Sequence, residues 1–173
     1  MRLVAWSRMG GLALGLLLAA PAAAETPALL SVHAGAFDFL KERKAGLVDV
    51  EYRGRPLLWW FRPVAGGMFD TDNAAYGYGG LAIEIWFGTQ IVLTPSAVAG
   101  VYGNGDRNAK KLGSSTEFRT GSELAWRFQN DTRVGIGFHH ISNAGIAKKN
   151  PGTELLTLTV AIPLQRFLAA VSP

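Results

Sequence analysis

Cysteine is absent from this chain of 173 residues. Without thiols, neither disulfide bonds nor thiolate metal sites can stabilise the fold. The length is enough to close one barrel or one sandwich around a single core. The sequence therefore predicts one domain without covalent cross-links.

Apolar runs long enough to cross a bilayer as a helix, about 20 residues, are also lacking. The N-terminal apolar run, Met9 to Ala20, is twelve residues long. It follows Arg2 and Arg8 and precedes three alanines at 22–24, an arrangement typical of a secretory signal peptide. We expect residues 1–24 to be a signal peptide cleaved after Ala24, and residues 25–173 to form the exported domain.

Charge is scarce, with 17% charged residues and a net charge of +4. Removing Arg2 and Arg8 with the signal peptide takes the basic residues from 17 to 15, against 13 acidic ones. So small an excess gives little support for nucleic-acid binding, least of all in an exported protein. We therefore expect no nucleic-acid partner.

The chain is rich in glycine, with 21 residues, and 49% of its residues are hydrophobic. Apolar and polar residues alternate over many short segments, which is the period of a β-strand with two different faces. The pattern predicts eight strands, which run over Leu30–Phe39, Leu47–Arg53, Leu57–Val64, Tyr76–Phe87, Gln90–Tyr102, Thr116–Gln129, Thr132–Ser142 and Thr153–Leu164, with Phe167 as an alternative end of the last.

One face of these strands is aliphatic and the other carries charges of both signs, among them Glu51, Arg62, Glu84, Arg119, Glu123 and Arg127. A soluble barrel would bury the aliphatic face, whereas a membrane barrel turns that face outward and encloses the charges. Mixed signs fit an enclosed ion-pair network, and Trp and Tyr near strand ends fit a membrane interface. We predict an all-β fold, an eight-stranded antiparallel transmembrane β-barrel, with a soluble lipocalin-like barrel as the alternative.

Loop lengths give an orientation for such a barrel. With the N-terminus in the periplasm, the connections after the first, third, fifth and seventh strands face outward, and we expect them, including 66–75, to be the longer ones. These connections carry an excess of cations, namely Lys41, Arg43, Lys44, Arg107, Lys110, Lys111, Lys148 and Lys149 against Glu42, Asp70, Asp72 and Asp106. Such cations would attract the phosphates of lipopolysaccharide, although charged loop tips are also simply solvated.

His140, Ser142 and Glu154 are the candidate catalytic residues. By strand parity they lie on the aliphatic face, where polar side chains are costly unless they are functional. A serine nucleophile, a histidine base and an acid that orients the histidine would form an esterase triad. If Ser142 pairs with Glu154 across the hairpin, the acid lies diagonal to His140.

The neighbouring residues refine this hypothesis. His139 points into the barrel by parity, which favours His140 as the base. Asn143 and the backbone donors up to Gly145 are candidates for the oxyanion hole. Each residue also has a structural explanation, since a histidine at a barrel rim can bind headgroups and a serine at a strand end can cap a turn.

The run His140-Ile141-Ser142-Asn143-Ala144, with Glu154 twelve residues after the serine, resembles the lipid A 3-O-deacylase family of outer-membrane esterases (PagL type). This resemblance implies an eight-stranded barrel in which His140, Ser142 and Glu154 are catalytic and Asn143 lies near the oxyanion hole. It implies an ester-linked acyl chain of lipid A as the substrate, and neither metal nor cofactor. The end of the chain departs from outer-membrane proteins, because residues 168–173 follow Phe167 where a terminal aromatic residue is common.

The sequence thus favours an outer-membrane serine esterase that hydrolyses an ester-linked acyl chain of lipid A, at the 3-O position, in lipopolysaccharide. The alternative is a small non-enzymatic outer-membrane barrel with a structural or binding role. The acyl position, the choice between lipid A and phospholipid, and the formation of a homodimer all stay open at this point.

Overall fold

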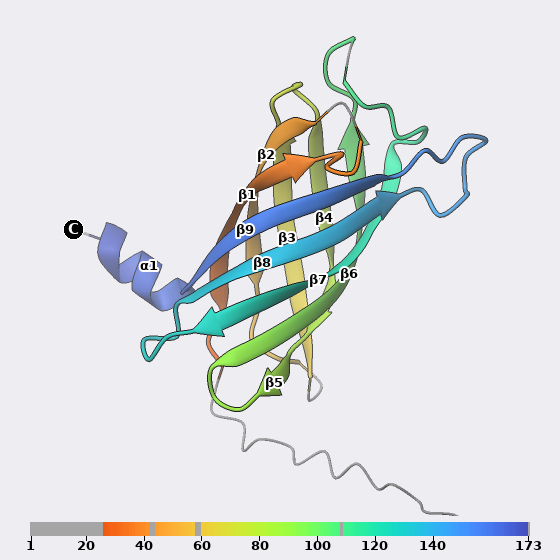
Figure 1. Cartoon of the computed structure of the whole chain (residues 1–173). Coiled ribbons are helices and arrows are strands. Elements are labelled where there is room, and N and C mark those ends of the chain that lie inside the picture. Colours follow the sequence, from red (N-terminus) through yellow and green to blue (C-terminus); the bar gives the residue numbers. More distant parts are fainter. Residues whose placement is uncertain (1–25, 42–43, 58–59, 108, 173) are drawn as a thin grey trace, which may run out of the picture.

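The computed structural model describes residues 26–41, 44–57, 60–107 and 109–172, and the expected signal peptide, 1–24, lies outside these residues. In the described part, nine β-strands form one sheet that closes on itself, and a helix follows the last strand (Figure 1). The elements are β1 (Leu29–Phe37), β2 (Ala45–Arg53), β3 (Phe61–Asp70), β4 (Ala75–Ile83), β5 (Ile85–Phe87), β6 (Ile91–Gly103), β7 (Thr116–Arg127), β8 (Arg133–Ser142), β9 (Thr153–Pro163) and α1 (Leu164–Val171).

The closed sheet is an eight-stranded barrel, because β4 and β5 flank Glu84 and both pair with β6. Closure comes from the pairing of β1, the first strand, with β9, the last. All neighbouring strands run antiparallel, as the alternating sequence pattern predicts. The predicted fold class is confirmed.

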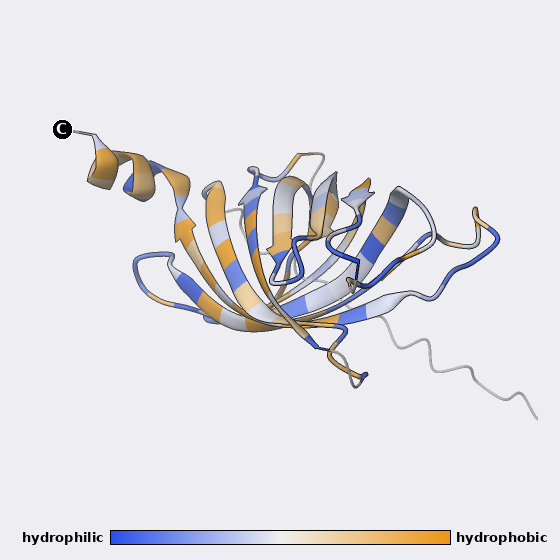
Figure 2. Cartoon of the chain, turned by 90° about the horizontal axis from the view of Figure 1, so that it is seen from above, coloured by the Kyte–Doolittle hydropathy of each residue, from blue (hydrophilic) through white to orange (hydrophobic). Residues whose placement is uncertain are grey.

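The aliphatic face of the strands points outward. Along β2, Val48 and Val50 are exposed while Asp49 and Glu51 are buried. Apolar and polar bands alternate in the same way along the other strands (Figure 2). A lipocalin-like barrel would bury the aliphatic residues inside, and the described strands do not have this arrangement.

Ion pairs fill the middle of the barrel. Arg119 donates to Asp49 at 2.8 Å and to Glu51 at 2.9 Å, and Arg53 lies 3.0 Å from Glu51 and 3.4 Å from Glu123. A buried charge without a partner would cost several kcal/mol, which explains why the enclosed charges alternate in sign. The cavity among these side chains measures about 10 Å³, roughly the space of one water molecule, so the interior is packed.

A second buried group lies where β7 ends and β8 begins. Glu84 binds both Arg62 and Arg133 there. Arg127 has the inward parity predicted for it and lies over the Trp86 ring, as buried Arg133 does, but it is half-exposed and pairs with Asp131 at 2.6 Å. As the last residue of β7, Arg127 lies at the end of the barrel, where its guanidinium is partly open to solvent and reaches the adjacent hairpin.

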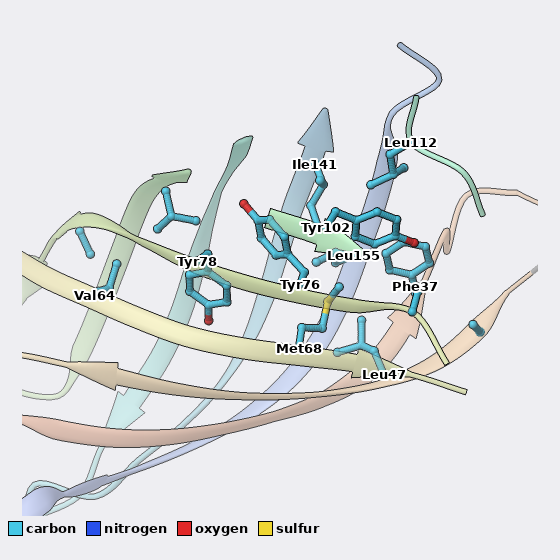
Figure 3. Packing of buried hydrophobic residues seen from close by; sticks show 14 residues of the cluster. Phe37, Leu47, Val64, Met68, Tyr76, Tyr78, Tyr102, Leu112, Ile141 and Leu155 are labelled. Atoms are coloured by element: carbon cyan, nitrogen blue, oxygen red, sulfur yellow. The ribbon is translucent and has the colours of Figure 1, made fainter. Parts of the chain in front are cut away.

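The interior changes to apolar packing toward the end that carries the connection 143–152 between β8 and β9, called the β8–β9 end below (Figure 3). Phe37 and Tyr102 stack there with ring centroids 6.4 Å apart. Tyr76 and Tyr102 are almost completely buried, so these tyrosines belong to the core and not to an outward aromatic belt. The charge pattern of the sequence did not predict this apolar layer.

β3 differs from its prediction by running from Phe61 to Asp70, so most of the expected loop 66–75 is strand. Glycine at 66 is typical of a loop, but here it leaves room for the Tyr78 hydroxyl, which a Cβ would meet. The true turn, 71–74, closes on Asp70, whose Oδ1 accepts from the N–H groups of Asp72 at 2.9 Å and Ala74 at 2.8 Å.

Loop lengths agree with the predicted orientation only in part. The connections 104–115 and 143–152 at the β8–β9 end are the long ones, as expected. The connection 71–74 at the same end is shorter than the connection 54–60 at the opposite end, which reverses the expectation for that pair.

The last strand ends at Pro163, and residues 164–171 are helical, so a strand extending to Phe167 is wrong. Proline has no N–H for a further strand hydrogen bond, and its φ of −55° suits the residue before a helix. Among the described residues, no helix has the length and apolar character needed to cross a membrane.

Candidate active site

β8 and β9 bring His140 and Glu154 face to face. The two residues are direct partners in the β8–β9 register, and Nδ1 of His140 lies 3.4 Å from Oε1 of Glu154. Both side chains lie on the outward face, His140 45% exposed and Glu154 21% exposed. The predicted base and the predicted orienting acid are therefore in contact distance of each other.

The register differs from the expected one. Glu154 lies opposite His140 and not opposite Ser142, which pairs with Phe118 of β7. The register is fixed along the whole hairpin, for example by Val134 opposite Val160. The shift replaces a diagonal arrangement by a direct cross-strand pair, which is the shorter of the two.

Ser142 lies two residues beyond His140 on the same face of β8, about 7 Å away along the strand, and is half-buried. Because Nδ1 of His140 faces Glu154, Nε2 is the nitrogen left for a partner on the opposite side of the ring. His139, by contrast, is 7% exposed and points into the barrel. The parity argument that separated the two histidines is confirmed.

Asn143, directly after Ser142, organises the connection 143–152. It is completely buried, and its Nδ2 donates to the carbonyl oxygens of Leu112 at 3.1 Å and Lys149 at 2.8 Å. Its Oδ1 accepts from the N–H of Gly145 at 3.1 Å. Asn143 therefore joins its own loop to the loop 104–115 and fixes the backbone beside Ser142.

The backbone donors expected at an oxyanion hole already have partners. The N–H of Asn143 donates to Oδ1 of Asn150 at 3.1 Å, and the N–H of Gly145 donates to Asn143 itself. Ala144 and Gly145 have φ values of 51° and 80°, so 143–146 is a left-handed turn, closed by the N–H of Ile146 on the carbonyl oxygen of Asn143 at 3.1 Å. The oxyanion role of Asn143 and Gly145 stays a prediction.

Gly152 contacts the imidazole of His140, which the sequence pattern did not reveal. Its φ is 58°, and a Cβ at this position would lie 2.8 Å from Cε1 and 3.2 Å from Nε2 of His140. A side chain would thus be strained by its own backbone and would displace the ring. The Asn150-Pro151-Gly152 turn was visible in the sequence, but its contact with the histidine was not.

Residues distant in sequence support the acid. The N–H of Phe39 donates to the carbonyl oxygen of Glu154 at 3.1 Å. Next to Glu154, the Thr153 hydroxyl donates to Oδ1 of Asp38 at 3.1 Å, and Asp38 also binds Lys110 at 2.9 Å. Closure of the barrel between β1 and β9 makes these contacts, so no local pattern could have predicted them.

The surroundings of the pair are apolar. Phe39 and Phe138 meet edge to face with ring centroids 6.3 Å apart, and Leu156 is 39% exposed next along β9 from Glu154. Oε2 of Glu154 is buried and has no hydrogen-bond partner among the described residues. Within the same residues no group of three or more His, Cys, Asp or Glu is arranged to hold a metal ion.

Comparison with known protein families identifies residues 50–163 as a match to the lipid A 3-O-deacylase (PagL) family. The chain belongs to this family. Lipid A deacylase PagL of Bordetella bronchiseptica (strain ATCC BAA-588 / NCTC 13252 / RB50) is 30% identical over 74 residues, which cover 43% of this chain and 42% of the relative. The alignment therefore spans less than half of that protein.

A solved structure agrees with the fold. The crystal structure of the outer membrane enzyme PagL superposes with a TM-score of 0.60 at 22% sequence identity, covering 78% of this chain and 99% of that one. At this identity the likeness supports the eight-stranded barrel alone. The matched family segment includes His140, Ser142 and Glu154 and ends where β9 ends.

Proposed function

We propose that the protein is a serine esterase of the outer membrane that hydrolyses an ester-linked acyl chain of lipid A, at the 3-O position. The observation that carries the proposal is the His140–Glu154 pair beside Ser142 on an apolar outward face. These groups take no part in the interior ion pairs, and polar groups on a lipid-facing surface are costly unless they are used. Membership of the lipid A 3-O-deacylase family supports lipid A as the substrate.

In the proposed reaction, Ser142 Oγ attacks the ester carbonyl carbon while its proton moves to Nε2 of His140. Glu154 holds the ring through Nδ1 and stabilises the imidazolium. When the tetrahedral intermediate collapses, the bond to the lipid A oxygen breaks and that oxygen takes the proton from His140. Water then attacks the acyl-serine by the same route, which releases the fatty acid and restores Ser142.

The oxyanion is assigned to the turn at Asn143–Gly145. Because the N–H groups of Asn143 and Gly145 have internal partners, substrate binding must exchange these hydrogen bonds for bonds to the oxyanion.

The membrane location is part of the proposal. Exposed apolar side chains on neighbouring strands support it, among them Val32 at 46% on β1 and Leu158 at 68% on β9. Lys41, Lys148 and Lys149 are exposed at the β8–β9 end, where they would meet lipopolysaccharide phosphates. Residues 1–24 would direct export as a cleaved signal peptide.

Mass spectrometry of lipid A from cells that express the protein or its Ser142→Ala variant tests the proposal. The protein should remove one acyl chain, which fragmentation should assign to the 3-O position, and Ser142→Ala should leave lipid A intact at equal outer-membrane abundance. Ser31→Ala is a matched control, because the Ser31 hydroxyl is buried inside the barrel, and should stay active.

Two other results would count against the proposal in different ways. Phospholipid deacylation in the same cells, with lipid A unchanged, would keep the esterase and replace its substrate. If neither lipid changes although the barrel is in the outer membrane, the non-enzymatic barrel becomes the better description.

A further inference from the structure

The C-terminal helix α1 lies outside the part of the chain that the family match explains. The match ends at Pro163, and α1 begins at the next residue. The N–H of Leu164 donates to the carbonyl oxygen of Ala28 at 2.8 Å, which ties the start of the helix to the wall beside β1. From there α1 points away from the barrel and does not fold across its opening (Figures 1 and 2).

One side of α1 is apolar and uncovered. Leu164, Phe167, Leu168 and Val171 follow the three- and four-residue spacing of one helix face. No residue of the helix is buried, and Leu168 and Val171 are 50% and 61% exposed. Covering an apolar stripe of this kind with something other than water is favourable.

Its charge favours lipid as the covering partner. The single charged residue of the helix, Arg166, lies opposite the stripe, and no acidic residue occurs from 164 to 173. A cation opposite an apolar stripe is the arrangement of helices that lie in a membrane interface, where the cation meets lipid phosphates.

The position of α1 also fits a membrane surface. From Glu154 to Pro163, β9 advances nine residues, about 30 Å along the strand. With the usual strand tilt of roughly 40°, this corresponds to about 23 Å along the barrel axis, close to the roughly 25 Å apolar band of a membrane barrel. If the candidate site lies at one membrane surface, α1 starts at the other.

The apolar surface of the wall continues into the helix. The outward residues of β9, Leu156, Leu158 and Val160, are all exposed, and only the three residues 161–163 separate them from α1. Lipid that covers these strand residues therefore reaches the start of the helix.

We propose that α1 lies in the headgroup region of the membrane leaflet at the barrel end opposite the candidate site. Its stripe faces the acyl chains and Arg166 faces the phosphates, so the helix anchors the last strand in the periplasmic leaflet. This inference rests on the proposed membrane location of the barrel, but it does not depend on the esterase chemistry.

The cysteine-free chain allows a direct test by site-directed spin labelling. Leu168→Cys and Val171→Cys probe the stripe, Gln165→Cys and Ala169→Cys probe the opposite side, and Leu158→Cys marks the outward barrel wall. Each full-length variant is labelled in vesicles of phosphatidylethanolamine and phosphatidylglycerol at a ratio of about 3:1. Power saturation then compares access of oxygen, which concentrates in lipid, with access of a nickel chelate, which stays in water.

The stripe labels should favour oxygen at least about threefold over the labels on the opposite side. If all four helix labels favour nickel while the label at 158 favours oxygen, the helix lies in water and the inference is wrong although the barrel is in the membrane. If the label at 158 also favours nickel, the membrane location itself fails. Spin–spin broadening at 168 that disappears on dilution with unlabelled protein would show that a second copy of the chain covers the stripe. This result would overturn the proposal that lipid covers it.

Discussion

His139 and His140 are neighbours on β8 in opposite surroundings. His139 points into a barrel interior in which Arg119 binds two carboxylates and Glu84 binds two arginines. His140 points outward and faces one carboxylate, that of Glu154, on a surface that is otherwise apolar. Interior charges have several partners each and hold the barrel wall together, whereas the outer pair is held by few contacts and is open to a ligand.

The two histidines should differ most in their effect on activity. His140→Ala removes the base and should lower the rate of fatty acid release by at least about 10³-fold. His139→Ala should keep turnover per folded molecule within a few-fold, because that ring does not reach the outer face. Release of fatty acid from purified lipid A, normalised to folded protein, measures the turnover of both variants. Equal losses of turnover would mean that the outward histidine has no special role in the reaction.

The ion pairs inside the barrel should contribute more to the free energy of unfolding than the outward His140–Glu154 pair does. Arg119→Met leaves Asp49 and Glu51 without their shared partner and should lower the free energy of unfolding by about 3–5 kcal/mol. Urea unfolding in detergent measures this, with Lys111→Met, an exposed loop cation, as the control that should change little. A stability loss as small as that of the control would mean that the network contributes little to the fold.

Replacing the carboxylate of Glu154 should have the opposite effect, a large loss of turnover with a small loss of stability. Glu154→Gln keeps the size of the side chain but no longer stabilises the imidazolium, so turnover should fall by about 10²-fold or more. The free energy of unfolding should change by less than about 1 kcal/mol, because the pair is partly exposed. Steady-state kinetics and urea unfolding of the same preparation separate the two effects, and a large stability loss with full turnover would assign Glu154 to the fold.

The smallest effect is expected at Gly152. A methyl group there meets the ring of His140, so Gly152→Ala should lower turnover by roughly tenfold. The positive φ should also cost about 1–2 kcal/mol of stability through backbone strain. Gly88→Ala is the matched control, since Gly88 also has a positive φ, 70°, but its Cβ would have open space. If both variants lose stability and neither loses turnover, Gly152 does not position the base.

The inward and outward faces of the wall could be predicted from sequence because a strand alternates strictly. Parity assigns Asp49 and Glu51 to one face, Val48 and Val50 to the other, and His140 rather than His139 to the aliphatic face, while the mixed charges indicate which face is inside. The glycines at 66 and 67 predicted a loop, but both lie in β3, and Gly66 leaves room for a tyrosine within the barrel.

Contacts that depend on closure or on register could not be predicted. The direct pairing of His140 with Glu154 depends on the length of the 143–152 connection, and the support of Glu154 by Phe39 requires β1 to meet β9. The helix at 164–171 continues the apolar pattern of the strand before it, and Pro163, the last residue of that strand, is the local signal that the strand ends.

Covalent capture of the nucleophile tests the central claim, that the outward group of His140, Ser142 and Glu154 performs ester hydrolysis. The folded protein is incubated with a long-chain alkyl fluorophosphonate, which reacts with activated serines, and the adduct is located by peptide mass spectrometry. The proposed mechanism predicts one adduct, on Ser142, that appears together with loss of deacylation and is strongly reduced in His140→Ala. An active protein that is inhibited through another residue, or that stays fully active with Ser142 labelled, would contradict it.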